Sequence, residues 1–249
     1  MLDIATRIAL GPLLLAQAAR VRRSALELPE PRGARRGQAG LGPCVLRLLV
    51  AGDSSAAGVG TPSQREALAW PLAERLSRRL AGAVRWQLVA ASGLTSEGVL
   101  HRLIHTRPEP ADVAVIVVGV NDITKDAPLA FALRQRQHIA DWLQVHAGVR
   151  HVVFPALPEM ELFPAVPRPL AWYAGQAARR NNRAQARWAA RAPGVSHVVM
   201  QGIAHRDLFS ADGFHPGPTI YSRVADRLAD HIFEVTRATA PELNKRGTA

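Results

Sequence analysis

Short apolar runs alternate with longer stretches of helical periodicity along most of the chain. Five runs of aliphatic and β-branched residues, each flanked by turn residues, predict strands at residues 45–50, 84–90, 113–118, 152–154 and 195–200. The stretches between and after these runs predict helices at residues 63–80, 96–105, 128–146, 169–190 and 217–237. Strands that alternate with helices in this way favour an α/β fold with a parallel sheet of about five strands and helices on both faces.

The first 43 residues differ from the remainder of the chain. Residues 4–19 are apolar, but an arginine and a proline interrupt them, and they are shorter than the roughly 20 residues that a membrane-spanning helix needs. Residues 29–43 are rich in Pro, Gly and Arg and predict an extended linker or arm. We therefore expect an apolar helix with an arm, one compact domain and a disordered tail, at residues 1–43, 44–240 and 241–249.

Basic residues near the N-terminus bear on where the protein is located. They follow the apolar stretch instead of preceding it, which is not the order of a signal peptide. An apolar helix followed by RVRR, at residues 20–23, suits contact with an anionic membrane surface, and it suits equally well the packing of its leucines on the domain. The expected location is the cytoplasm or the inner face of the membrane, with residues 1–36 as the candidate membrane contact.

The charge of the chain has a compositional explanation. The 249 residues carry a formal net charge of +11, and all basic residues except Lys125 and Lys245 are arginines, a bias typical of an Ala- and Arg-rich sequence. Aromatic residues, at 5%, are too scarce to favour a nucleic-acid surface. Cys44 is the only cysteine, which excludes an intrachain disulfide. The length and composition predict one globular domain and leave the oligomeric state open.

A glycine- and serine-rich turn follows the first predicted strand, where residues 52–60 read GDSSAAGVG. The glycine spacing and the lack of a following lysine exclude a P-loop, and this turn contains neither GxGxxG nor GxSxG. A serine here lies at the carboxyl end of a strand, where an open α/β sheet forms its ligand crevice. Such a serine acts as a nucleophile only if a base takes its proton.

Among the nine histidines, His215 is the best candidate for that base. It lies in the turn-rich segment SADGFHPGP, three residues after Asp212, a spacing that can bring a carboxylate to Nδ1 and leave Nε2 free. The alternative is an ordinary helix entry with an acidic residue. Gly93 and Asn121 follow the second and third predicted strands, where a backbone or amide N–H can stabilise an oxyanion, although both residues are also common in turns.

These four segments, in this order and at these strand ends, resemble those of the SGNH hydrolases, the superfamily of GDSL-type esterases and lipases. The resemblance extends from Cys44 to about Ile232. It implies a flavodoxin-like, three-layer α/β/α sandwich. By their places in the GDS block, it also implies that Ser54, and not Ser55, is the nucleophile.

The same resemblance implies the other catalytic roles. Asp212 orients His215, which acts as the base, while the Ser54 backbone N–H, Gly93 and Asn121 form the oxyanion hole. The implied function is that of a serine esterase that hydrolyses small or medium acyl esters through an acyl-enzyme, with no metal and no organic cofactor.

Two other functions stay open at this point. An acyltransferase would use the same acyl-enzyme, and a basic membrane-surface or nucleic-acid-binding protein would reuse the fold without catalysis. The proline-rich and aromatic residues 154–173 predict a wall of the acyl pocket or a mobile flap. Asp122 is expected to be structural, because a second carboxylate would oppose the charge that develops in an oxyanion hole.

Overall fold

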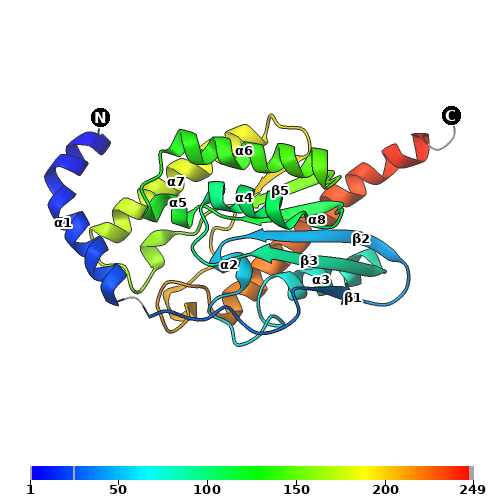
Figure 1. The fold of residues 1–249 in the computed structure, drawn as a ribbon, viewed down its shortest axis with the longest axis horizontal. Coiled ribbons are helices and arrows are strands. Elements are labelled where there is room, and N and C mark those ends of the chain that lie inside the picture. Colours follow the sequence, from blue (N-terminus) through cyan, green and yellow to red (C-terminus); the bar gives the residue numbers. More distant parts are fainter. Residues whose placement is uncertain (1, 25, 247–249) are drawn as a thin grey trace.

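The protein is built around one sheet with helices on both of its faces (Figure 1). The structure, a computed structural model, describes the backbone of residues 2–24 and 26–246. The six strands lie in the order β1-β3-β2-β4-β5-β6. Their bounds are β1 Arg36–Ala39, β2 Cys44–Gly52, β3 Ala83–Ala90, β4 Val113–Val117, β5 His151–Pro155 and β6 Val195–Val198.

The predicted α/β fold is confirmed, with one strand more than the sequence predicts. Strands β2 to β6 correspond to the five predicted strands and pair in parallel. The additional strand, β1, pairs antiparallel with β3 at one edge, so the sheet is mixed. Its sequence, RGQA, has neither a β-branched residue nor an apolar alternation, and a pattern-based prediction therefore has no signal for it.

Helices form two layers that bury alternate residues of the strands. Leu48 and Val50 of β2 pack against α3 and α8, whereas Leu49 and Ala51 pack against the layer of α4, α6 and α7. The α-helices are α1 Leu2–Ser24, α2 Ser54–Ala57, α3 Ala69–Leu80, α4 Ser96–Thr106, α5 Val120–Thr124, α6 Leu129–His146, α7 Leu170–Ala189 and α8 Pro218–Arg246. Two 3₁₀ turns, η1 and η2, cover Met160–Leu162 and Arg206–Leu208.

Two helices differ from their predicted limits. Helix α3 begins at Ala69 and not at residue 63, which places Pro71 in the first turn. In a helix that began at residue 63, the same proline would lie in the interior, remove a hydrogen bond and clash with the preceding turn. Helix α8 continues to Arg246, so the tail predicted for residues 241–249 is helical up to that residue, and residues 247–249 lie outside the described part.

Residues 30–39, predicted as part of a free arm, are bound to the sheet; we call them the N-terminal strap. The Glu30 carboxylate accepts hydrogen bonds from the backbone N–H (2.7 Å) and the hydroxyl (3.0 Å) of Ser92. Arg35 pairs with Glu30 at 3.0 Å and donates to the Ala90 carbonyl at 2.8 Å. Ala39, in β1, is buried. The strap therefore crosses the carboxyl end of β3, and the compact unit includes residues before Cys44.

Helix α1 lies against the start of α7, at the left of Figure 1. The Gln17 amide donates to the Arg168 carbonyl at 2.8 Å and accepts from the Leu170 N–H at 3.1 Å, while Leu14 is buried. No helix within residues 2–24 and 26–246 has both the length and the apolar character that a membrane crossing requires. The predicted contact with an anionic membrane stays a prediction.

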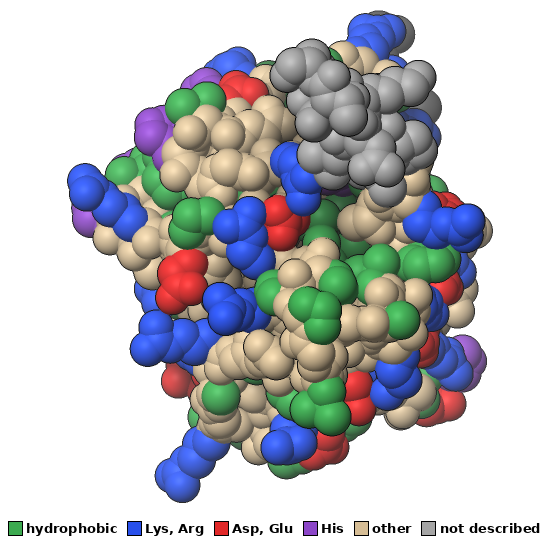
Figure 2. Space-filling view, turned by 90° about the vertical axis from the view of Figure 1, so that its right-hand side faces the viewer, with side chains coloured by type: hydrophobic (Ala, Val, Ile, Leu, Met, Phe, Trp, Pro, Cys, Tyr) green, Lys and Arg blue, Asp and Glu red, His purple; other side chains and the backbone are tan. Residues whose placement is uncertain are grey.

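Charged side chains at the amino ends of the strands are of mixed sign. Figure 2 shows arginines scattered over this end of the molecule among acidic and apolar side chains. Asp112, before β4, is one centre of this arrangement, because it pairs with Arg47 at 2.8 Å and with Arg150 at 3.0 Å. These ion pairs hold the starts of three neighbouring strands together at the end of the sheet opposite the carboxyl ends.

A partly buried histidine in β5 is expected to make the stability of the fold depend on pH. Burial, together with the nearby His231, lowers the pKa of His151 from 6.5 to about 4, and Ser196 Oγ lies 3.0 Å from its Nε2 and 2.7 Å from the Nε2 of His231. Between these pH values the unfolded chain binds a proton that the folded chain does not. The contribution of His151 to the free energy of unfolding is therefore largest above pH 6.5 and falls as the pH is lowered towards 4.

Replacing His151 by Gln is thus expected to reduce the loss of stability between pH 7 and pH 5 by a few degrees of melting temperature. Thermal unfolding followed by circular dichroism at both pH values measures this loss. The exposed His101, changed to Gln, is the matched control and should leave the loss as in the wild type. Equal losses in all three proteins would contradict the assignment to His151.

Candidate active site

The Ser54 side chain is presented by a sharp turn between β2 and α2. Gly52 ends the strand at φ +154°, and a Cβ on it would lie 1.9 Å from the Val117 carbonyl oxygen, so no larger residue fits. Asp53 then caps α2 by accepting the Ser55 N–H at 2.9 Å. Burial raises the pKa of the Asp53 carboxyl to about 7, against the opposing effect of the N–H groups of the first turn. Ser54 consequently stands as the first residue of a rigid helical turn.

The Asp212 carboxylate orients His215 within a tight loop before α8. Its Oδ2 lies 2.5 Å from His215 Nδ1, and its Oδ1 accepts from Ser210 Oγ (2.7 Å) and from the N–H groups of Phe214 (2.9 Å) and His215 (3.0 Å). Burial would raise the pKa of Asp212, but these hydrogen bonds outweigh it and hold the pKa below its usual range. The carboxylate thus stays charged beside Nδ1.

The structure brings Ser54 and His215 together across 161 residues of sequence. His215 Nε2 lies 2.8 Å from Ser54 Oγ, which is hydrogen-bonding distance. With Nδ1 bound to Asp212, the Nε2 lone pair faces the serine hydroxyl. Ser55, by contrast, is held through its backbone N–H by Asp53, as part of the cap. The arrangement can transfer a proton from Ser54 to His215.

The two other predicted site residues lie on adjoining loops at the same sheet edge. Asn121, in α5 directly after β4, lines the same cavity as Ser54, and its Nδ2 donates to the Leu94 carbonyl at 3.0 Å. Gly93, with φ +78°, is next to Leu94, and its carbonyl accepts from Lys125 Nζ at 2.8 Å. Among the described residues, Asn121 is part of the cavity wall and Gly93 is not.

A small apolar cavity of about 50 Å³ adjoins Ser54. Its wall includes the rings of Phe163, Phe209 and Phe214, and the ring of Phe163 packs edge-to-face on both of the others, with centroids 5.2 and 4.9 Å apart. The Phe214 ring is 5.4 Å from that of His215. The apolar wall therefore begins directly beside the imidazole.

The segment 154–173 forms part of that wall. Pro158 and Phe163 line the cavity, and Phe163 is 2% exposed. Asn182 of α7 bonds both the N–H (2.8 Å) and the carbonyl (3.0 Å) of Leu157. In the structure this segment therefore forms part of the cavity wall and is joined to α7 at Leu157, and the predicted mobile flap stays a prediction.

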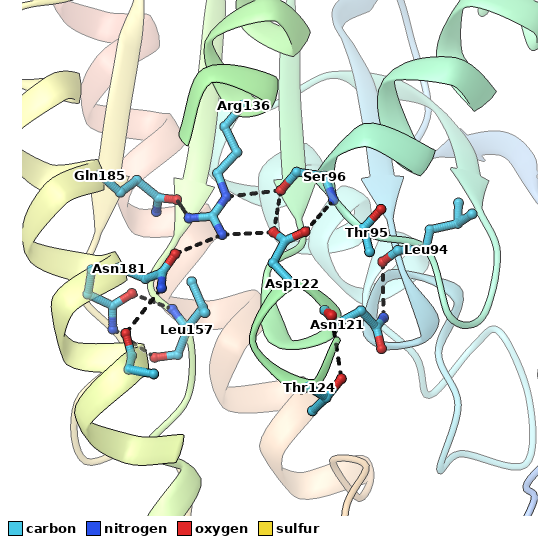
Figure 3. Close-up of polar contacts among 12 residues, drawn as sticks. Leu94, Thr95, Ser96, Asn121, Asp122, Thr124, Arg136, Leu157, Asn181 and Gln185 are labelled. Carbon is cyan, nitrogen blue, oxygen red and sulfur yellow. Dashed lines mark hydrogen bonds and ion pairs between the residues drawn. The ribbon is translucent and has the colours of Figure 1, made fainter. Parts of the chain in front are cut away.

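Sequence reasoning missed the polar residues behind the site. Arg136 in α6 and the α7 side chains Asn181 and Gln185 are buried and lie in one network with Asp122, whose carboxylate points towards Arg136 and Ser96 (Figure 3). A signal was present, since the buried face of α6 is apolar except at Arg136. An arginine within an apolar stripe indicates a buried partner of opposite charge.

Comparison with known proteins agrees with this geometry. The profile of the GDSL-like lipase/acylhydrolase family matches residues 50–223, and the chain belongs to this family. A GDSL-like esterase of Mycobacterium tuberculosis is 29% identical over 194 residues, which are 75% of this chain and 61% of that protein. The chain thus spans less than two thirds of the length of this relative. The resemblance to GDSL-type hydrolases noted in the sequence is confirmed.

Solved structures show the same fold. The lipase Lip_vut3 from a goat rumen metagenome superposes with a TM-score of 0.59 at 18% identity and covers 74% of this chain and 96% of its own. TesA superposes with a TM-score of 0.58 at 23% identity, over 78% of this chain and 98% of its own. The three-layer α/β/α architecture is therefore shared at low sequence identity.

Proposed function

We propose that the protein is a serine esterase that hydrolyses short acyl esters, with Ser54 as the nucleophile. The observation that carries the proposal is the chain of contacts from Ser54 Oγ to His215 Nε2 (2.8 Å) and from His215 Nδ1 to the buried Asp212 carboxylate (2.5 Å). The family supports ester hydrolysis as the reaction class. The chain of contacts supplies the nucleophile, the base and the group that orients the base.

The reaction follows from these contacts in two halves. Ser54 Oγ attacks the ester carbonyl while its proton passes to His215 Nε2, and the imidazolium that forms is stabilised by Asp212. His215 then gives the proton to the departing alkoxide, which leaves an acyl group on Ser54. In the second half, a water molecule loses its proton to the same Nε2 and attacks the acyl carbonyl; the bond from the acyl carbon to Ser54 Oγ then breaks, His215 returns the proton to Oγ, and the acid is released.

The negative oxygen of each tetrahedral intermediate needs donors in the cavity. We assign this role to the Ser54 backbone N–H and the Asn121 amide, which line the cavity, and to the Gly93 backbone N–H, which would donate from the adjoining segment outside the cavity wall. The first turn of a helix leaves its N–H groups without intrahelical partners, and Ser54 is the first residue of α2. Asn121 Nδ2 uses one hydrogen on the Leu94 carbonyl, which fixes the amide and leaves its second hydrogen for an oxyanion.

Replacing Asn121 by Ala is expected to lower kcat by about 10² to 10³, because one preorganised donor is lost while the nucleophile and base remain. Steady-state hydrolysis of p-nitrophenyl acetate measures the effect. Thr124→Ala, one turn further along the chain and exposed, is the control and should hydrolyse at the wild-type rate. A kcat within threefold of the wild type in Asn121→Ala would remove Asn121 from the oxyanion hole.

The size of the cavity supports a short acyl group. A group the size of a water molecule needs roughly 10 to 15 Å³ of cavity volume. The cavity of about 50 Å³ therefore holds about four non-hydrogen atoms, which is the size of an acetyl to butyryl group. Phe163, Phe209 and Phe214 make the wall apolar, which suits an alkyl chain. The cavity therefore favours small acyl esters over long-chain lipids.

We expect kcat/KM for p-nitrophenyl esters to be highest between acetate and butyrate and to fall for octanoate. Phe209→Ala should move the maximum to longer chains, since removing the ring lengthens the cavity. Phe233→Ala, whose ring stacks on Arg237 in α8 and does not line the cavity, is the matched control. A wild-type maximum at octanoate would contradict the proposed substrate class.

A further inference from the structure

Arg136 lies fully buried behind the oxyanion donors and is the centre of a polar network (Figure 3). Its guanidinium donates to Ser96 Oγ (3.2 Å), Gln185 Oε1 (3.0 Å), Asp122 Oδ2 (3.1 Å) and Asn181 Oδ1 (3.3 Å). Arg136 and Asp122 have side chains 0% and 4% exposed, respectively. A charged pair is therefore buried on a face of α6 whose other buried side chains are apolar.

Such a pair is a costly way to stabilise a core. Transferring two charges from water into the interior carries a penalty that their attraction often fails to exceed, so apolar residues of similar volume would commonly be as stable. What the network adds is geometry, because each of the guanidinium's bonds has a fixed direction. The effect of the network therefore depends on which backbone segments the hydrogen bonds of Arg136 hold in place.

Two of the four bonds, those to Asp122 and Ser96, reach the segments that carry Asn121 and Gly93, while the other two reach α7. Asp122 directly follows Asn121, and its carboxylate accepts the backbone N–H (2.9 Å) and the hydroxyl (2.5 Å) of Ser96. Ser96 begins α4, immediately after the loop of Gly93 and Leu94. On the cavity side the loops are joined a second time, since Asn121 Nδ2 donates to the Leu94 carbonyl. Two cross-links thus fix the separation of the loops.

Arg136 also contacts the turn on the other side of Asn121. Gly119 has φ +131°, and a Cβ there would lie 2.5 Å from Arg136 Nη2. The guanidinium therefore packs closely under the backbone that leads into Asn121, and it binds the residue that follows. Its positive charge also offsets the Asp122 carboxylate, which would otherwise oppose negative charge on a nearby oxyanion.

We propose that Arg136 is a positioning residue for the oxyanion hole: through Asp122 and Ser96 it holds Asn121 and the Gly93 loop at the separation that the tetrahedral intermediate requires. The inference rests on the proposed function. Arg136 is shielded from the cavity and touches no reacting atom; it acts through the residues that it holds.

The test compares Arg136→Lys and Arg136→Met with the wild type. Active sites are counted by stoichiometric labelling with a fluorophosphonate, with the labelled residue mapped, and kcat for p-nitrophenyl acetate is expressed per labelled serine. We expect kcat per site to fall roughly tenfold or more in Arg136→Met and less in Arg136→Lys, which keeps the charge beside Asp122. KM should stay within about twofold of the wild-type value, because the oxyanion donors contribute less to binding of the substrate than to binding of the tetrahedral intermediate.

A control separates positioning from a general loss of stability. Leu143→Ala truncates a fully buried side chain on the same helix, two turns from Arg136, that belongs to the apolar cluster of Ile139 and Val152. It should lower the melting temperature but leave kcat per labelled serine unchanged. If the Arg136 variants behave like Leu143→Ala, with lower melting temperature and wild-type kcat per site, the proposal is overturned.

A milder variant keeps the test decisive if the Arg136 variants fail to fold. Ser96→Ala removes only the hydroxyl that accepts from Arg136 and donates to Asp122. It should lower kcat per labelled serine severalfold at unchanged KM, and an unchanged kcat would overturn the proposal. Failure of the proposed function is distinguishable, because the fluorophosphonate would then label no Ser54 in the wild type.

Discussion

Replacing Ser54 by Ala is expected to lower kcat for p-nitrophenyl acetate by roughly 10⁴-fold or more, since it removes the atom that forms the acyl-enzyme. His215 and Asp212 keep their contact in this variant, because their bond and the backbone bonds around it do not involve Ser54. The fold should therefore be intact, and unfolding should occur near the wild-type temperature. The measurement is steady-state hydrolysis with labelling by a fluorophosphonate.

Ser55→Ala is the matched control for that variant. Ser55 participates in the turn through its backbone N–H, which alanine keeps, so hydrolysis and labelling should persist. Loss of activity in Ser55→Ala together with persistence in Ser54→Ala would reverse the assignment of the nucleophile. Persistence in both variants would remove this turn from the reaction.

Replacing Asp212 by Asn is expected to lower kcat on the order of 10⁴-fold. An amide of the same shape can still accept the N–H bonds of the loop through its one oxygen, but it then places a neutral NH₂ group at Nδ1 and no longer stabilises the imidazolium. The variant should fold, because the loop keeps its hydrogen bonds. Rates measured from pH 6 to pH 9 should be low throughout, since no pH restores the missing charge.

The chain contains a natural control for this substitution. Asp207 lies 3.2 Å from His205 in a second acid–imidazole pair, but both side chains are largely exposed. Asp207→Asn should leave hydrolysis unchanged. A similar loss in both variants would indicate a general effect of charge on this end of the molecule and would contradict the role of Asp212.

The main elements and the candidate site could be predicted because their signals are local. Strands β2, β4 and β5 have dense runs of β-branched and aliphatic residues, and these runs appear in the sequence without knowledge of the partners. The four polar segments follow directly on strand ends or precede the last helix, where their chain order can be compared with that of a known family. Both the strand patterns and the order of the polar segments can be recognised from the sequence alone.

What could not be predicted depends on contacts between distant segments. The apolar face of α6 indicates that Arg136 has a buried partner, but only the positions of Asp122 and Ser96 in space identify that partner. The cavity likewise needs Phe163 and Phe209, 46 residues apart, to meet edge-to-face. Strand β1 exists because β3 offers it an unpaired edge, a property of the assembled sheet.

The strap determines how much of the chain is needed to keep the sheet covered. A protein expressed from Cys44 onward would keep every residue of the proposed catalytic set, and the family profile itself begins only at residue 50. It would nevertheless expose the unpaired backbone N–H and C=O groups of β3 along Val84 to Gln87. An exposed strand edge can pair with the edge of another molecule and cause aggregation. Insolubility after such trimming would therefore report an uncovered sheet edge, and a trimmed version should instead retain Glu30.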